Sequence, residues 1–230
     1  MSRSSRKQLQ PPQARVVGFV CEGSTDIVVL RRLVEATVGP VDARPLRPVT
    51  DELDRQRPGT QAGWSEVRAW CQDLESFDEL FNPEVGDPLD LLVIAIDLDI
   101  AIRAGVAKLP ANLDAYDATE LCTLVKSWLP EPVPGKAIIA IPVMATEAWI
   151  LAALFPKLTG VERLPDPAGV LVKRDKIEQG RNGPWKRASE YRSFADTVAN
   201  KLKRVRKECR EANRFVGKLE NVRASLPIVR

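Results

Sequence analysis

The sequence predicts an α/β fold in which helices flank a mostly parallel sheet. Two apolar runs, at residues 15–21 and 91–96, are rich in Val, Ile or Leu and suit strands that are buried on both faces. A third run, at residues 136–143, has the same character. Segments with helical spacing follow the first and the third run, and this alternation is typical of parallel sheets.

The composition is that of a globular chain with one large domain, or with one domain and an appendage. The chain has 230 residues, of which 44% are apolar and 28% are charged. No apolar run reaches the length of a membrane span and the N-terminus lacks the apolar centre of a signal peptide, so we expect a cytoplasmic protein that does not contact membranes. The four cysteines form no CxxC pair and are expected to be reduced thiols.

The chain contains no histidine, which excludes several kinds of active site. Ser-His-Asp and Cys-His triads, HNH-type nuclease centres and His-ligated metal sites all require that side chain. A metal would have to be held by oxygen ligands, which favours Mg²⁺ or Mn²⁺. General acid–base chemistry would fall to carboxylates, Lys, Tyr or metal-bound water.

The first expected strand follows a polar, basic segment at residues 1–13, which we expect to be a disordered arm. The strand leads directly into the turn Glu22–Asp26, which reads EGSTD. A helix is expected next, with Ser24 or Thr25 as N-cap and a Gly-Pro pair at its end. Glu22 thus stands at the carboxyl end of a strand, although a capping or surface role is the alternative.

The middle of the chain predicts an edge strand, a helix and a second buried strand. Two prolines place a short strand at residues 43–49 on the edge of the sheet. Apolar and aromatic side chains at helical spacing over residues 64–81 indicate core packing rather than a base-stacking surface. The strand at residues 91–96 then runs into Asp97-Leu98-Asp99.

The two aspartates stand where open α/β sheets bind their ligands, at the carboxyl end of a buried strand. Strand geometry would direct Asp97 and Asp99 to the same side, because they are two residues apart. Like charges so close together resist joint ionisation, and a divalent cation is their natural counter-charge. The alternative is a solvated turn, where Asp is common.

A third strand end also presents an acid. The strand at residues 136–143 follows an expected helix at residues 117–129 and precedes Thr146–Leu151, which is typical of a helix start. Glu147 falls in the first turn of that helix. It could join an acidic site or, alternatively, interact only with the helix dipole.

The last part of the chain is basic. From Lys173 to Arg214 there are fourteen Lys and Arg residues against six Asp and Glu residues. Residues 158–179 follow no clear period, whereas a single apolar stripe over residues 188–222 predicts one long helix or two shorter ones. A basic segment beside an acidic site suits a phosphate-rich substrate. The alternative is that the charges only solvate a helix face.

The motifs EGSTD, DLD and TEAWIL, each placed after a buried strand, resemble those of the TOPRIM domain. That domain is shared by topoisomerases, primases and nucleases of the overcoming-lysogenisation-defect class. The spelling EGSTD is closer to the nuclease branch than to topoisomerases. The strand followed by EAWIL resembles a group of small TOPRIM-like bacterial proteins that are often grouped with phage defence. The resemblance implies a TOPRIM-like (Rossmann-like) domain over residues 14–157, with a basic helical extension, residues 158–230, packed on it.

The resemblance and the acidic strand ends together imply a metal-dependent nuclease that acts on DNA or RNA. Mg²⁺ or Mn²⁺ would be held by four acids: Glu22, Asp97, Asp99 and Glu147. Glu22 could instead orient the attacking water. Lys173 and Lys186 are the candidate catalytic cations that would stabilise the transition state. The candidate nucleic-acid contacts are Arg174, Lys186, Arg187, Lys203, Arg206 and Lys207.

The implied biological role is that of an effector in bacterial anti-phage defence. The chain has no GxxxxGK[ST] motif, so ATP-driven steps would need a separate ATPase subunit. The alternative function is a TOPRIM-like regulatory or scaffolding subunit with little or no catalysis. The basic amphipathic C-terminal segment is also compatible with a homo-oligomer.

Overall fold

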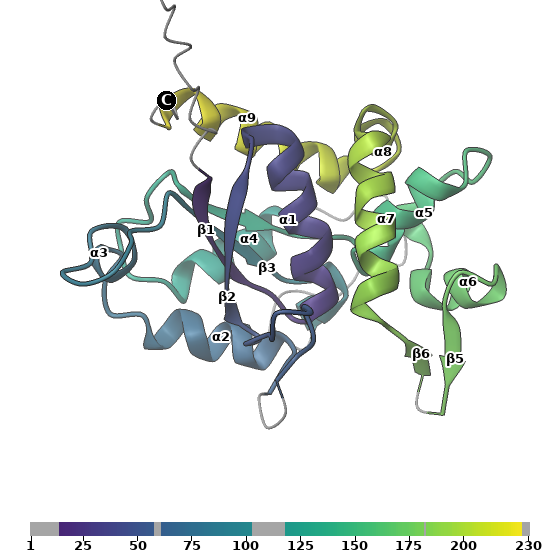
Figure 1. The fold of residues 1–230 in the computed structure, drawn as a ribbon, viewed down its shortest axis with the longest axis horizontal. Coiled ribbons are helices and arrows are strands. Elements are labelled where there is room, and N and C mark those ends of the chain that lie inside the picture. Colours follow the sequence, from purple (N-terminus) through teal and green to yellow (C-terminus); the bar gives the residue numbers. More distant parts are fainter. Residues whose placement is uncertain (1–13, 58–60, 103–117, 182, 227–230) are drawn as a thin grey trace, which may run out of the picture.

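Four parallel strands form the central sheet in the order β2-β1-β3-β4 (Figure 1). The computed structural model describes residues 14–57, 61–102, 118–181 and 183–226. The strands are β1 (Arg15–Val20), β2 (Val41–Arg47), β3 (Leu91–Ala95) and β4 (Ala137–Ala140). Each neighbouring pair is parallel, so the predicted α/β fold with a parallel sheet is confirmed.

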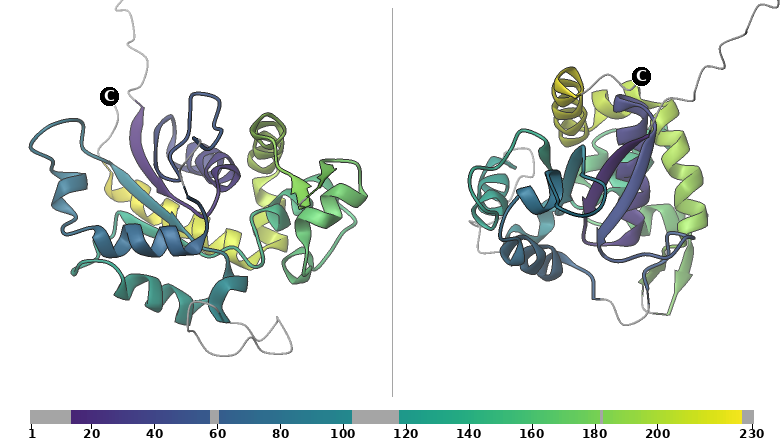
Figure 2. Two further views of the ribbon diagram at one scale, coloured as in Figure 1. Left: turned by 90° about the horizontal axis from the view of Figure 1, so that it is seen from below. Right: turned by 60° about the vertical axis from the view of Figure 1, so that its left-hand side comes forward.

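The apolar runs form strands because both faces of the sheet are covered. Along β3, Leu91, Val93 and Ala95 belong to one apolar core, whereas Leu92 and Ile94 belong to the other. The first core is covered by α1 (Ser24–Val38), α5 (Glu147–Leu154), α7 (Ala188–Asn200) and α9 (Arg210–Ser225). The second is covered by α2 (Trp64–Asp73), α3 (Asp78–Phe81) and α4 (Thr119–Ser127). Figure 2 shows the sheet between these two layers.

The strand order creates a switch point between β1 and β3. The chain leaves β1 through α1 and returns to β2 on one side, whereas it leaves β3 through α4 and returns to β4 on the other. The carboxyl ends of β1 and β3 therefore lie side by side at the place where open α/β sheets bind their ligands.

The part beyond residue 158 contains more elements than the sequence predicts. Residues 158–179, which follow no clear period, include the 3₁₀ helix η3 (Val161–Arg163) and α6 (Pro167–Lys173). A hairpin of β5 (Glu178–Gly180) and β6 (Gly183–Trp185) follows. The expected one or two helices over residues 188–222 are three, with α8 (Leu202–Glu208) between α7 and α9.

Local backbone geometry explains the breaks between these three helices. Lys201 separates α7 from α8, and Cys209 between α8 and α9 is extended. The Glu162 carboxylate then accepts hydrogen bonds from the backbone N–H groups of Arg210 and Glu211, at 2.7 and 3.2 Å, and caps the start of α9. Because Glu162 is far away in the sequence, the apolar stripe could not predict this break.

Two further expectations are wrong. The helix expected over residues 64–81 is divided, because Leu74 is extended and the Ser76 hydroxyl accepts a hydrogen bond from the N–H of Asp78 at the start of α3. The N-cap of α1 is Gly23 rather than Ser24 or Thr25, which already belong to the helix. The predicted edge position of the proline-containing strand β2 is confirmed.

In the described part of the chain, no helix is both long and apolar enough to cross a bilayer. The arm predicted at residues 1–13 lies outside the described residues, as do residues 227–230 of the C-terminal segment.

Candidate acidic site

The carboxyl ends of β1 and β3 are joined by a carboxylate. Oε1 of Glu22, two residues after β1, accepts a hydrogen bond from the backbone N–H of Asp97 at 2.8 Å. Asp97 follows β3 by two residues. The structure thus brings these two predicted residues together across the switch point.

Asp99 is placed differently from the expectation. It lies in the 3₁₀ helix η1 (Leu98–Ile102), which begins directly after Asp97. The alternation of side chains along a strand therefore does not apply to Asp97 and Asp99, and the argument from their spacing is wrong. Asp99 is nevertheless close enough to Asp97 to raise the pKa of that carboxyl group.

Asp26 is a member of the site that the sequence reasoning did not include. Its buried Oδ1 accepts a hydrogen bond from the Thr146 hydroxyl at 2.7 Å, which joins the start of α1 to the start of α5. Asp26 is the third residue of α1 and also accepts a hydrogen bond from the N–H of Gly23, the return half of a capping box. The signal was present in the EGSTD motif, whose second acid is Asp26.

Glu147 begins α5 beyond the end of β4, and its side chain is fully buried. Oε1 accepts a hydrogen bond from the Tyr191 hydroxyl at 2.5 Å and lies 2.6 Å from Nζ of Lys186. Oε2 has no hydrogen-bond partner among the described residues. Such an oxygen, buried without a partner, is suited to accept a cation or a proton donor.

Lys186 brings a positive charge to these acids. It follows β6, and 40% of its side-chain surface is exposed although its ammonium group contacts the buried Glu147. Burial opposes its charge, but Glu147, Asp26 and Asp97 outweigh that effect, and the pKa of Lys186 is raised. The other predicted catalytic cation, Lys173, is exposed at the end of α6, and no contact in the described residues joins it to an acid of the site.

Tyr191 could not be found from the sequence, because its position in α7 looks like part of an apolar stripe. It is fully buried, and both burial and the adjacent Glu147 raise the pKa of its hydroxyl. Tyr191 therefore stays protonated and donates its hydrogen bond at any ordinary pH.

Burial and neighbouring acids raise the pKa of two carboxyl groups of this site, those of Asp26 and Asp97. Burial raises the pKa of Asp97 well above its usual range, and Asp26, Glu22, Glu147 and Asp99 raise it further. Burial and neighbouring acids, Asp26 foremost, raise the pKa of the Cys21 thiol in the same way. Surroundings that favour protonation of Asp97 also favour the binding of a cation beside it.

The donor chemistry fits a hard divalent cation, because every candidate ligand is a carboxylate oxygen. The side chains, as they lie, do not yet form a complete set of ligands for such a cation. Among residues 14–57, 61–102, 118–181 and 183–226, no three Asp, Glu or Cys side chains are grouped so that they could hold a metal ion. A metal would therefore require carboxylates to rotate from the positions described.

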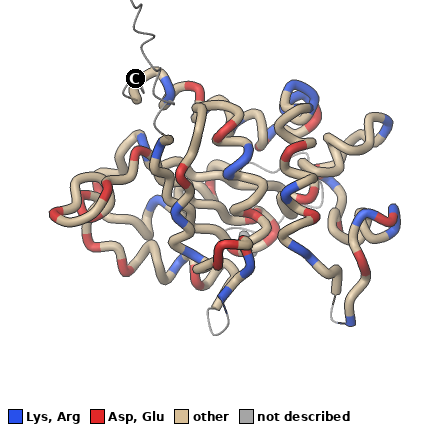
Figure 3. The backbone as a smooth tube through the Cα atoms, viewed as in Figure 1, with Lys and Arg blue, Asp and Glu red and all other residues tan. Residues whose placement is uncertain are grey.

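The predicted nucleic-acid contacts are spread over the segment after α5, and among them Lys186 contacts an acid of the site. Figure 3 shows Lys and Arg concentrated over α6, α8 and the β5–β6 hairpin. Arg174 lies over the ring of Phe155 at 4.5 Å, and Arg187 over the ring of Trp185 at 4.2 Å. Arg206 pairs with Glu220. Lys203 and Lys207 are exposed on α8, and no described contact joins them to the acids.

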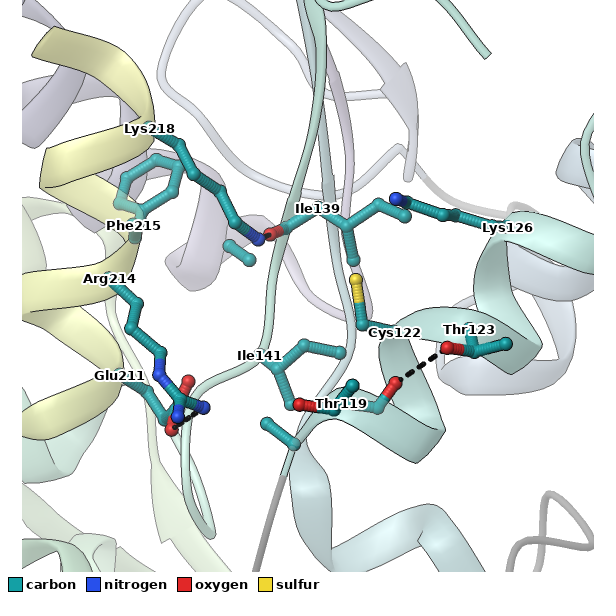
Figure 4. A pocket seen from close by; sticks show the side chains of 12 residues that line it. Thr119, Cys122, Thr123, Lys126, Ile139, Ile141, Glu211, Arg214, Phe215 and Lys218 are labelled. Atoms are coloured by element: carbon teal, nitrogen blue, oxygen red, sulfur yellow. Dashed lines mark hydrogen bonds and ion pairs between the residues drawn. The ribbon is translucent and has the colours of Figure 1, made fainter. Parts of the chain in front are cut away.

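A separate pocket of about 230 Å³ lies at the open edge of β4, between α4 and α9 (Figure 4). Nζ of Lys218 in α9 donates a hydrogen bond to the Ile139 carbonyl at 2.7 Å, within this pocket. The acid there, Glu211, pairs with Arg214 at 3.0 Å. None of the predicted site residues lines this pocket.

Comparisons of the chain with protein-family models, with curated proteins and with solved structures find no match. The TOPRIM assignment therefore stays a prediction from the motifs.

Proposed function

We propose that the acidic edge of the sheet hydrolyses phosphodiester bonds in nucleic acid with the help of Mg²⁺ or Mn²⁺. The observation that supports this proposal is the gathering of carboxylates near the switch point, where the buried acids Asp26 and Glu147 and the further acids Glu22 and Asp99 all raise the pKa of Asp97. Mutual repulsion of this kind costs stability, and it is relieved when a divalent cation binds.

In this proposal each residue of the site has a separate role. Glu22, Asp97, Asp99 and Glu147, with Asp26 as an additional candidate, would hold the metal. When bound, the metal would polarise the phosphate and activate water. Tyr191 orients Glu147 through its hydrogen bond. Lys186 would move its charge from Glu147 to the phosphate oxygens that become more negative in the transition state.

The test compares wild-type protein with Asp97→Asn on plasmid DNA, single-stranded DNA and RNA. We expect cleavage that requires Mg²⁺ or Mn²⁺, is abolished by EDTA and falls by about 100-fold or more in the variant. Asp87→Asn, at an exposed acid on the surface, is the matched control and should cleave like the wild type. If wild type and Asp97→Asn behave alike on every substrate, with and without a co-expressed ATPase, hydrolysis at this site is excluded.

A second candidate function is a regulatory or scaffolding subunit with no catalysis. It is favoured by the ion pair of Lys186 with Glu147, which places an ammonium group among the acids, and by the lack of a three-acid metal group in the described residues. Under this function, titration calorimetry would detect no Mg²⁺ binding, and an ATPase would co-purify equally with wild type and Asp97→Asn.

Both candidates are compatible with a role in bacterial anti-phage defence, which we propose on the TOPRIM resemblance alone. The informative comparison is phage plating on cells that carry the wild-type gene or the Asp97→Asn gene. An effector nuclease loses protection with this substitution, whereas a scaffolding subunit retains it.

A further inference from the structure

We propose that the cleft beside the β5–β6 hairpin binds single-stranded nucleic acid, with one base stacked on the ring of Trp185. This inference rests on the proposed function, because it names the form of substrate that the acidic site would receive. It is carried by the exposed tryptophan, by the cations around it and by the direct connection of the cleft to the acids.

The cleft has a volume of about 660 Å³, within the range of ligand-binding clefts. Its walls come from three parts of the chain that meet beside the switch point. Ser24, in the first turn of α1, lies two residues from Glu22. The segment around Arg55 forms a second wall, and Trp185 to Arg192 form the third. A strand lying in this cleft would reach the first turn of α1 and so the acidic edge.

Trp185 has the exposure of a binding residue rather than of a core residue. Trp185 is 55% exposed, whereas Trp149 is fully buried. The guanidinium of Arg187 lies 4.2 Å from the centre of the Trp185 ring and holds it by a cation–π contact. A large apolar ring in this position offers a flat surface on which any base can stack.

Trp185 is also directly joined to the acidic site. The next residue, Lys186, directs its ammonium group to the buried Glu147, whose Oε1 is 2.6 Å away. Successive side chains in extended backbone point in opposite directions, so the ring of Trp185 faces outward while Lys186 faces the acids. The phosphate next to a base stacked on Trp185 would therefore lie near Lys186, the neighbouring residue in the chain.

The charges of the cleft suit a phosphate backbone. Lys186, Arg55, Arg187 and Arg192 line it, against the single acid Asp54. Each arginine makes an exposed ion pair, with Asp51, Glu178 and Asp54 respectively. Exposed pairs of this kind contribute little free energy, so phosphates can compete with the carboxylates for the guanidinium groups.

The aromatic contact favours a single strand over a duplex. In a duplex both faces of each base are already stacked, whereas a single strand offers its bases to an aromatic ring. Duplex DNA would meet only the arginines, through its phosphates. Loss of the Trp185 ring should therefore weaken the binding of single strands and leave the binding of duplexes nearly unchanged.

The experiment measures binding in EDTA, so that hydrolysis is blocked. Full-length wild type, Trp185→Ala and Trp185→Phe are titrated into fluorescein-labelled oligothymidylate of about 16 nucleotides, oligouridylate of equal length, and a duplex. We expect Trp185→Ala to weaken single-strand binding by about 5- to 150-fold, Trp185→Phe to retain most of it, and duplex binding to change by less than about twofold. Val85→Ala, at a 90% exposed residue between α3 and β3, is the control and should bind like the wild type.

Equal single-strand affinities of wild type and Trp185→Ala overturn the proposal, and they leave a protein partner as the occupant of the cleft. An equal loss of duplex and single-strand binding also overturns it, because stacking would then not be involved. The outcome is independent of catalysis. Selective single-strand binding without metal-dependent cleavage would contradict the proposed nuclease function and support this inference. Metal-dependent cleavage that Trp185→Ala leaves unchanged would support the nuclease function and contradict this inference.

Discussion

Two acidic side chains of the site, Asp26 and Glu147, are buried, and both raise the pKa of the neighbouring Asp97. Burying carboxylates close together destabilises the folded state, and the raised pKa values of Asp26 and Asp97 reflect this cost. Residues kept at a cost in stability are typical of functional sites. The site therefore makes predictions about stability that are independent of any activity.

The first prediction concerns Asp97→Asn in EDTA. Folding raises the pKa of Asp97, so the folded state binds a proton more tightly than the unfolded state, and the charge of Asp97 destabilises the folded state wherever both states are ionised. At about pH 8 the variant should melt about 2–8 °C higher than the wild type. The gain should shrink as the pH falls through the raised pKa towards about 4.

Differential scanning fluorimetry over a pH series measures this effect. Asp87→Asn should show no shift at any pH, because its side chain is exposed. A melting temperature of Asp97→Asn below that of the wild type at pH 8 would show that Asp97 stabilises the fold without a metal.

The second prediction concerns the pair of Lys186 and Glu147. Lys186→Met leaves Glu147 buried with Tyr191 as its remaining partner, and we expect a loss of about 1–3 kcal/mol, reduced from the value for fully buried pairs because Lys186 is partly exposed. In the double variant Lys186→Met/Glu147→Gln part of that loss should return. Urea unfolding of the four proteins in the cycle measures the coupling.

Lys176→Met is the control for this cycle, since Lys176 is an exposed lysine of the same segment. Its effect should stay within about 0.5 kcal/mol. Strictly additive losses for Lys186 and Glu147 would mean that the ion pair contributes nothing to the fold.

Among the elements, α5 connects the site to the rest of the molecule. It begins with Glu147 at the acidic edge, and Trp149 in its first turn is stacked on Phe215 of α9, with ring centres 6.2 Å apart. Arg204 in α8 donates hydrogen bonds to carbonyl groups at the end of α5, including that of Ala152 at 2.6 Å. The position of Glu147 thus depends on helices about 60 residues later in the chain.

The third prediction tests the packing of Trp149 by comparing two tryptophans. Trp149→Ala removes a fully buried ring and should cost about 3–5 kcal/mol. Trp185→Ala, at a residue that is 55% exposed, should change stability by less than about 1 kcal/mol. Chemical denaturation monitored by circular dichroism measures both, and similar losses would contradict the packing described here.

Sequence patterns predicted the elements whose cause is local. The strand ends that carry Glu22 and Asp97 followed from apolar runs, since a strand buried on both faces leaves an unmistakable pattern. The start of α9 and the contact of Tyr191 with Glu147 did not, because each depends on residues more than 40 positions apart. Asp26 was visible in its motif, but only the hydrogen bond from Thr146 places it at the site.

At the scale of the whole molecule, the segment after residue 158 completes the core over one face of the sheet. Val198 of α7 and Leu219 of α9 are fully buried in the same apolar core as Val17 of β1. The basic surface of these helices therefore lies on a layer that the sheet requires. One face of these helices stabilises the fold, and the opposite, basic face is available for binding.

The hydrogen bond from Lys218 to the Ile139 carbonyl has a consequence for solubility. β4 is an edge strand, and an unprotected edge is a template on which another strand can pair. An ammonium group held against the edge carbonyl in the pocket of Figure 4 opposes such pairing. Lys218→Ala should therefore form concentration-dependent aggregates in light scattering, whereas Lys126→Ala, from the facing helix, should not. Lys218, which is not part of the acidic site, would then be the side chain that keeps this edge strand from pairing with another molecule.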